Sequence, residues 1–178
     1  VTGSGTGKQA FLENKPALFN TTGTVHFAGS DSVLSDAEIL AYNQNFAPTY
    51  GQLIQIPSVG TSVTVPYNNG SSNLDLSVTQ LCGVFSGKIT QWNQISASRT
   101  GAITVIYRNE KSGTTELLTR FLENACSASD TAGTNLIGGK FSTTQEFWKQ
   151  FSTLPTNFTT AATLGSQPLY DKVYATAG

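Results

Sequence analysis

The apolar residues of this chain follow two spacings, one typical of strands and one typical of helices. Four runs combine β-branched or aromatic residues, and such runs predict β-strands. They lie at 24–28, 53–56, 61–65 and 103–107. Leu117, Phe121 and Ala125 instead recur at the spacing of one helix face. Strands that alternate with helices predict an α/β fold with largely parallel sheets.

Several helix starts are marked by capping boxes, in which a Ser or Thr is followed three residues later by Glu or Gln. Ser35 with Glu38 and Thr143 with Glu146 fit this pattern. We expect four helices here. Two cover 8–12 and 144–151, one begins at 35, and one begins near Ser77, with Gln80 three residues on. In the helix that begins at 35, the expected apolar face comprises Ile39, Leu40 and Phe46.

The stretch from Tyr67 to Asn73 has no apolar periodicity and consists mainly of Asn, Gly and Ser. Such turn-forming residues are typical of a linker. We therefore predict part of a first α/β lobe at 1–67, a hinge crossing at 68–73, and a second lobe at 74–178. Because the chain starts directly at a glycine loop, we expect a fold that is incomplete at both ends.

Charge is sparse in this sequence of 178 residues. Only 12% of the residues are charged and the net charge is -1, so the broad positive field that attracts nucleic acid or an anionic membrane is lacking. An anionic ligand must therefore be held in a pocket by a few donors. No apolar run approaches the roughly 20 residues of a membrane span, and the abundance of Ser, Thr, Asn and Gly favours a location outside the cytosol.

The chain contains two cysteines, Cys82 and Cys126, without a CxxC spacing and with a single histidine elsewhere. This combination argues against a zinc site. A disulfide is favoured, and two unpaired buried thiols are the alternative.

Arg108 closes the fourth predicted strand and precedes the turn Ser112-Gly113-Thr114, which opens a helix. A helix N-terminus presents free N–H groups and a partial positive charge, and so suits a small oxyanion. Hydroxyls of Ser112 and Thr114, and the planar fork of Arg108, could add donors. Equally, Ser112 could simply cap the helix while Arg108 pairs with Glu110 at the surface.

Two further candidates lie near the N-terminus. Ser4 is part of a glycine loop, with Gly3 and Gly5 on either side, that fits neither a P-loop nor a dinucleotide fingerprint. A flexible end is the alternative. Asp31 follows the first predicted strand, where an Asx turn is the ordinary role. A carboxylate there could also accept the proton of hydrogen phosphate, which sulfate lacks, and so select between the two anions.

Four ordered motifs, together with the later segment 164–167, resemble the DING branch of phosphate-binding proteins, which serve bacterial phosphate importers. The motifs are Gly3-Ser4-Gly5-Thr6-Gly7-Lys8, Phe27-Ala28-Gly29-Ser30-Asp31-Ser32, Leu81-Cys82-Gly83-Val84-Phe85-Ser86-Gly87 and Tyr107-Arg108-Asn109-Glu110-Lys111-Ser112-Gly113-Thr114-Thr115. The resemblance implies a periplasmic-binding-protein-like fold of type II, with two α/β lobes that close on phosphate. The segment that gives DING proteins their name, and the threonine-leucine-proline turn after it, are not in this sequence.

By resemblance, the ligand is inorganic phosphate and no cofactor or metal is needed. The implied contacts are Ser4 and Asp31 from the first lobe, with Arg108, Ser112, Gly113 and Thr114 from the second. Gly3, Gly5 and Ser30 support the first set, and Glu110 orients the arginine. The family also joins two helices by a disulfide where Cys82 and Cys126 stand. The resemblance implies a periplasmic or secreted monomer that delivers phosphate to a membrane ABC transporter.

Two other classes of function stay open. Some DING relatives are described as phosphatases, but the sole His26 lies within a predicted strand, at a core or edge position, and no Ser/His/Asp set can be assembled. We therefore expect a binding protein in preference to an enzyme. A secreted interaction protein is the third possibility.

Overall fold

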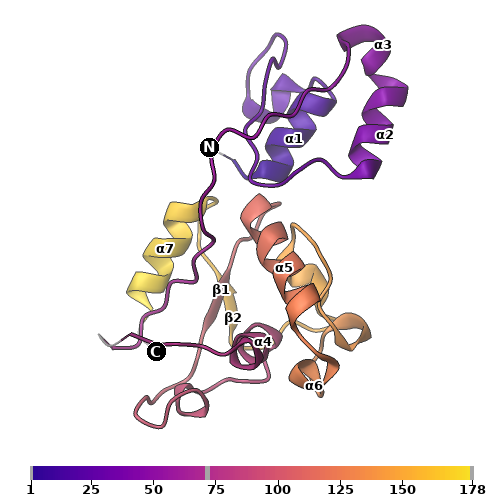
Figure 1. The fold of residues 1–178 in the computed structure, drawn as a ribbon. Coiled ribbons are helices and arrows are strands. Elements are labelled where there is room, and N and C mark those ends of the chain that lie inside the picture. Colours follow the sequence, from indigo (N-terminus) through magenta and orange to yellow (C-terminus); the bar gives the residue numbers. More distant parts are fainter. Residues whose placement is uncertain (1, 71–72, 177–178) are drawn as a thin grey trace.

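The computed structural model describes residues 2–70 and 73–176. Figure 1 shows two groups of elements, one above the other, joined by an extended stretch of chain. We call the elements up to Tyr50 the first lobe, residues 51–77 the connector, and everything from Val78 onward the second lobe. Residues 71 and 72 of the predicted crossing lie outside the described residues, and the boundaries 1–67, 68–73 and 74–178 stay a prediction.

The first lobe is built from helices. The predicted capping box at the start of its second α-helix is confirmed, since the Ser35 hydroxyl accepts from the Glu38 N–H and the Glu38 carboxylate accepts from the Ser35 N–H. The first helix begins at Ser4, four residues earlier than expected. The elements are α1 (Ser4–Leu12), the 3-10 helix η1 (Pro16–Phe19), α2 (Asp36–Asn45) and α3 (Ala47–Tyr50).

Three of the four predicted strands are absent from the described residues. The runs 24–28, 53–56 and 61–65 form no ladder, and His26 is exposed in irregular chain. A strand needs a neighbour that exchanges backbone hydrogen bonds with it, and no described segment pairs with these runs. Ile54 and Ile56 are consequently 78% and 76% exposed. These three strand predictions rested on composition alone, and they are wrong.

The predicted apolar face of α2 is also wrong in two of its members. Ile39 and Leu40 are exposed, while Tyr42 is buried and stacks on the half-buried Phe46 with ring centroids 6.2 Å apart. Apolar spacing indicates a face, but burial requires a second layer to cover it. Among the described residues, such a layer covers Tyr42 but not Ile39 or Leu40.

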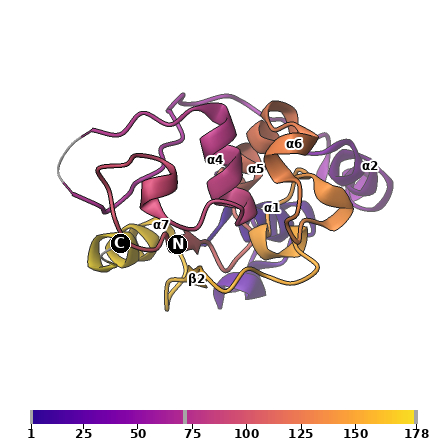
Figure 2. The ribbon, with the colours of Figure 1, turned by 90° about the horizontal axis from the view of Figure 1, so that it is seen from below.

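The second lobe contains the main core. Its strands β1 (Val105–Tyr107) and β2 (Phe158–Thr160) pair in parallel with Val105 opposite Phe158, as the alternation of strands and helices predicted. The remaining elements are α4 (Val78–Ser86), η2 (Trp92–Gln94), α5 (Gly113–Ala125), α6 (Ala128–Thr131), η3 (Ile137–Gly139), η4 (Phe147–Gln150) and α7 (Ser166–Ala175). Seen from below, α4, α5 and α6 lie together and α7 lies on the opposite side (Figure 2).

Aromatic rings fill the interior of this lobe. Phe147 stacks on Phe158 and meets Phe85 edge to face, with centroids 6.0 Å apart in both pairs. Such pairs contribute about 0.5–1.5 kcal/mol each beyond the area they bury. The buried core comprises Phe85, Trp92, Ile103, Val105, Leu122, Leu136, Phe141, Phe147, Phe151 and Phe158.

The helix predicted at 144–151 is reduced to η4, and its capping box does not form. The N–H and hydroxyl of Thr143 both donate to the Glu123 carboxylate on α5, at 2.8 and 2.6 Å. The Glu146 N–H donates to Thr144 instead. A tertiary contact has therefore replaced the local cap.

A disulfide joins Cys82 in α4 to Cys126, which ends α5. It confirms the pairing favoured by the sequence and excludes the alternative of two free thiols. The bridge fixes α5, and with it the Ser112-Gly113-Thr114 turn, on the core of the second lobe.

Candidate functional site

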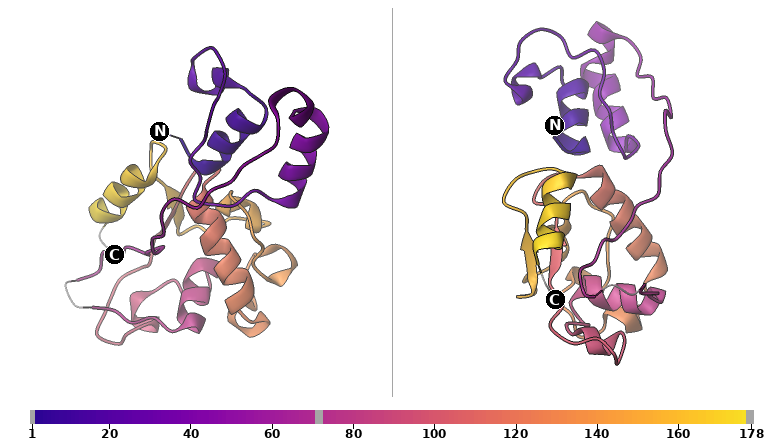
Figure 3. Two further views of the ribbon diagram at one scale, coloured as in Figure 1. Left: turned by 45° about the horizontal axis from the view of Figure 1, so that its top comes forward. Right: turned by 90° about the vertical axis from the view of Figure 1, so that its left-hand side faces the viewer.

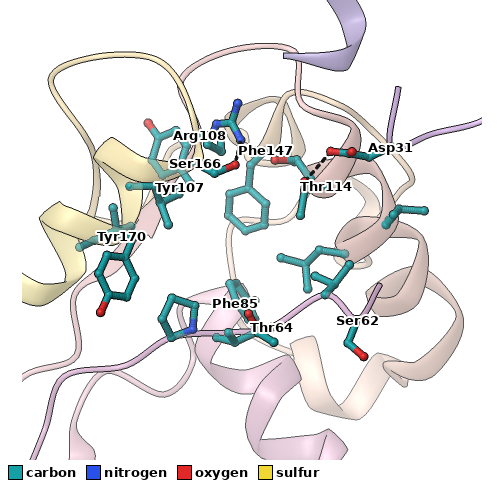
Figure 4. A pocket seen from close by; sticks show the side chains of 18 of the residues that line it. Asp31, Ser62, Thr64, Phe85, Tyr107, Arg108, Thr114, Phe147, Ser166 and Tyr170 are labelled. Carbon is teal, nitrogen blue, oxygen red and sulfur yellow. Dashed lines mark hydrogen bonds between the residues drawn. The ribbon is translucent and has the colours of Figure 1, made fainter. Parts of the chain in front are cut away.

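Four of the predicted site residues lie together where the two lobes meet. Asp31 receives two contacts: its N–H donates to the Ser4 hydroxyl at 3.0 Å, and its carboxylate accepts from the Thr114 hydroxyl at 2.9 Å. Figure 4 shows the Asp31 and Thr114 side chains pointing toward one another. The N-terminal ends of α1 and α5 therefore face each other across the lobe boundary (Figure 3).

Glycines permit this close approach. A Cβ on Gly113 would stand 2.5 Å from the Ser4 hydroxyl and 3.0 Å from the Asp31 Cβ. A Cβ on Gly3 or Gly5 would collide with Lys111, whose carbonyl accepts the Gly5 N–H at 3.3 Å. These glycines support the site by leaving room for the facing backbone.

Ser112 is the N-cap of α5. Its hydroxyl accepts from the Thr115 N–H at 3.2 Å, and its own N–H donates to the Gln145 carbonyl at 3.1 Å. The residue is 1% exposed. The capping role weighed from the sequence is thus observed, and it orients the free N–H groups of the first turn of α5 toward the lobe boundary.

Arg108 lies at the end of β1 in a second cluster. Its Nε and Nη2 pair with Oε1 of Glu110, and its Nη1 donates to the Ser166 hydroxyl at 3.0 Å. The side chains of Arg108 and Glu110 are only 12% and 7% exposed. The pairing considered at the sequence level exists, but it is largely buried and does not lie at the surface.

Both clusters border one cavity of about 990 Å³ between the connector and the second lobe. Asp31, Thr114, Arg108 and Ser166 are among its lining residues, and Figure 4 shows them at one end with Phe85 at the other. Ser30 also lines the cavity, and its hydroxyl donates to the Ser32 carbonyl at 2.7 Å. Ser4, Ser112 and Gly113 are buried beside it.

A buried ion pair holds the Asp31 loop against α1. Lys8 is 4% exposed and donates to the Val33 carbonyl at 3.2 Å and to the Glu38 carboxylate at 3.0 Å. Burial acts to raise the pKa of Glu38, but the hydrogen bonds from Ser35 and Lys8 outweigh it, so this pKa is lowered. The charged pair therefore connects α1, the loop after Asp31 and α2.

Sequence reasoning missed one residue of the second cluster, Ser166. Its hydroxyl contacts Arg108, and the N–H of Gly165 donates to the Glu110 carboxylate at 2.8 Å. The available signal was Gly-Ser directly before a helix, the same pattern that singled out Ser4.

Metal-binding groups and membrane-spanning helices were sought in the part of the chain that the structure describes. No three His, Cys, Asp or Glu side chains within 2–70 and 73–176 are grouped so that they could hold a metal ion. None of the described helices combines the length and apolar character needed to cross a membrane.

Comparison with known proteins places this geometry in context. The model of the PBP superfamily domain matches residues 1–175. A protein of Pseudomonas aeruginosa named alkaline phosphatase L is 58% identical over 128 residues, which cover 71% of this chain and 35% of that protein. A second relative, named phosphate-binding protein and from an unknown prokaryotic organism, is 46% identical over 98% of this chain and 42% of its own.

Solved structures share the fold. A phosphate-binding protein from Stenotrophomonas maltophilia has a TM-score of 0.95 at 57% identity, over 100% of this chain and 50% of that one. PfluDING, a high affinity periplasmic phosphate-binding protein solved with phosphate bound, has a TM-score of 0.85 at 48% identity, over 99% and 46%. The predicted fold class and the resemblance to DING proteins are confirmed. The chain spans half the length of these solved structures or less.

Proposed function

This chain belongs to the PBP superfamily, and we propose from that membership that it binds inorganic phosphate between its two lobes. The observation that carries the proposal is the hydrogen bond of Thr114 to Asp31, with Ser4 and Gly113 packed beside it. It joins the N-terminal end of α5 to the loop that contacts the N-terminal end of α1. Two helix N-termini thus converge on one point, an arrangement that favours a small oxyanion.

The predicted contacts have distinct roles in this proposal. Ser4 and Ser112 supply hydroxyl protons, and Gly113 and Thr114 supply free amides at the start of α5. The Thr114 hydroxyl holds Asp31 in place, and the Ser112 N–H is taken by the Gln145 carbonyl. Arg108 lines the cavity and contributes charge-assisted hydrogen bonds from the second protons of Nη1 and Nη2, while Glu110 pairs with Nε and Nη2. A net charge of -1 agrees with an anion held by placed donors.

Asp31 supplies selectivity. Its carboxylate accepts a hydrogen bond from the proton that hydrogen phosphate carries, whereas sulfate has no such proton and is repelled. The cost of a carboxylate beside an anion is offset only for the protonated ligand.

The biological role we propose is phosphate uptake. A periplasmic or secreted monomer would capture phosphate, close its lobes on it, and present it to a membrane ABC transporter. Support comes from PfluDING, a relative described as a high affinity periplasmic phosphate-binding protein. Hydrolysis is not proposed on the name of the Pseudomonas aeruginosa relative, because in the described residues the Ser112 hydroxyl hydrogen-bonds to the Thr115 amide and to no carboxylate or imidazole.

Calorimetric titration of the full-length protein with phosphate tests the proposal. Arg108→Ala is expected to weaken binding at least tenfold, because a charge-assisted donor is lost. Arg120→Ala is the matched control, since Arg120 lies on α5 with its side chain 46% exposed and pairs with Glu116 away from the cavity. Equal affinity in the wild type and both variants would refute the site.

A further inference from the structure

The N-terminal turn of α7 contacts the Arg108–Glu110 pair at two points. Ser166 accepts a hydrogen bond from Arg108 Nη1 at 3.0 Å, and the Gly165 N–H donates to Glu110 Oε1 at 2.8 Å. Both contacts come from a segment more than 50 residues farther along the chain. We propose that Ser166 is a positioning residue that orients Arg108 toward the anion, an inference that rests on the proposed function.

The argument begins with what Glu110 alone can fix. Arg108 and Glu110 stand two residues apart in the loop after β1, and Nε and Nη2 of the arginine share one carboxylate oxygen, Oε1. An ion pair whose two side chains come from the same loop can change orientation together, because both side chains keep their rotamer freedom. A third contact, from a different element, is needed to hold the guanidinium in one orientation.

The turn before α7 supplies that contact. Gly165 N–H reaches the same Oε1, so the carboxylate is fixed from the α7 side, while the Ser166 hydroxyl fixes the outer nitrogen Nη1. Gly165 has φ +114°, a conformation that L side chains rarely adopt, and so sets the direction of this turn. The partial positive charge at the start of a ten-residue helix also favours the Glu110 carboxylate.

α7 is itself anchored at its other end. The Asn68 side-chain amide in the connector donates to the carbonyls of Tyr174 and Thr176, at 2.8 and 3.0 Å. The helix also packs beside β1, the strand that directly precedes Arg108 (Figure 1). A helix held at both ends is a rigid support for the arginine, and rigid support reduces the loss of side-chain freedom on binding.

A purely structural role would predict a different result. If the Ser166 hydroxyl only stabilised the start of α7, its removal would lower the melting temperature and leave phosphate affinity intact. The proposal instead predicts a loss of affinity that depends on Arg108. Phosphate affinity and thermal unfolding therefore have to be measured on the same variants.

The experiment uses the full-length protein and five variants, one of them a double variant, titrated with inorganic phosphate by calorimetry. Ser166→Ala is expected to weaken binding about tenfold, and Ser166→Thr, which keeps the hydroxyl, to restore it to within about twofold. Ser127→Ala is the control, since it removes a helix-capping hydroxyl from α6 on the far side of the second lobe. In an Arg108→Ala background, Ser166→Ala is expected to have no further effect.

The outcomes separate this inference from the function on which it rests. If the wild type does not bind phosphate, or Arg108→Ala binds as well as the wild type, the proposed function fails. If Arg108→Ala weakens binding but Ser166→Ala matches the wild type, or weakens binding equally in both backgrounds, the positioning role of Ser166 is wrong.

Discussion

Thr114 Oγ1 donates a hydrogen bond to Asp31 Oδ2 at 2.9 Å, between residues 83 positions apart and in different lobes. Asp31 is also tied to Ser4 through its backbone N–H. One carboxylate thus links the start of α5 to the start of α1. The predictions below follow from this link and from the contacts that support it.

Removal of the Thr114 hydroxyl should weaken phosphate binding. Thr114→Val keeps the shape of the side chain but leaves the Asp31 carboxylate without this donor, and we expect a loss of about tenfold in phosphate affinity. Thr114→Ser keeps the hydroxyl and serves as the matched control. Calorimetry on both variants checks the prediction. Identical phosphate affinities of Thr114→Val and Thr114→Ser would contradict it.

A side chain at Gly113 should keep the lobes apart. The Cβ of Gly113→Ala would meet the Ser4 hydroxyl at 2.5 Å, so the contact between α1 and α5 cannot form without movement. We expect phosphate affinity to fall more than tenfold while the second lobe stays folded, because its core is untouched.

The matched control for this glycine is Gly29→Ala. An added Cβ at Gly29 meets no atom within 4 Å, although the residue lies in the same loop as Asp31. Titration together with circular dichroism separates a binding defect from unfolding. Full affinity in Gly113→Ala would show that this approach of the lobes is not needed.

The disulfide should stabilise the second lobe substantially. Cys82 and Cys126 are 44 residues apart, and closing a loop of that length stabilises a fold by about 4 kcal/mol on the chain-entropy model. Urea unfolding with and without reductant should differ by an amount of this order. A variant with both Cys82→Ser and Cys126→Ser should unfold like the reduced protein and be indifferent to reductant.

Acid should weaken the support of the Asp31 loop. The lowered pKa of Glu38 means that its contribution to stability is present above the unfolded value of 4.5 and is lost as pH falls through the folded value. In urea unfolding, Glu38→Gln should be less stable than the wild type at pH 7, and this difference should shrink as pH drops below about 4.5. A difference that does not change with pH would contradict an ionic role for Glu38.

Local signals in the sequence were sufficient where their partners lie within one turn of helix. The boxes at Ser35 and Ser77 form as predicted because donor and acceptor are three residues apart. The box predicted at Thr143 does not form, because the Thr143 hydroxyl donates to Glu123 on another helix. A pattern in sequence does not register a competing partner that only the fold brings near.

The site was foreseen in its residue types more than in its contacts. Motifs identified Asp31 and Arg108, but the partner of Arg108 at Ser166 comes from 58 residues away, and nothing in the spacing connects the two. Strand runs such as 53–56 failed for a related reason, since a strand exists only beside a neighbour. Long-range pairing is what the sequence pattern leaves out.

The most direct test of the central claim is anion selectivity, measured by calorimetry on the full-length protein near neutral pH. We predict that phosphate binds at least about 100-fold more tightly than sulfate, and that Asp31→Asn reduces this ratio about tenfold or more, because the amide no longer repels sulfate or accepts the ligand proton as a charged group. Equal affinities for the two anions, or a ratio unchanged in Asp31→Asn, would contradict the account.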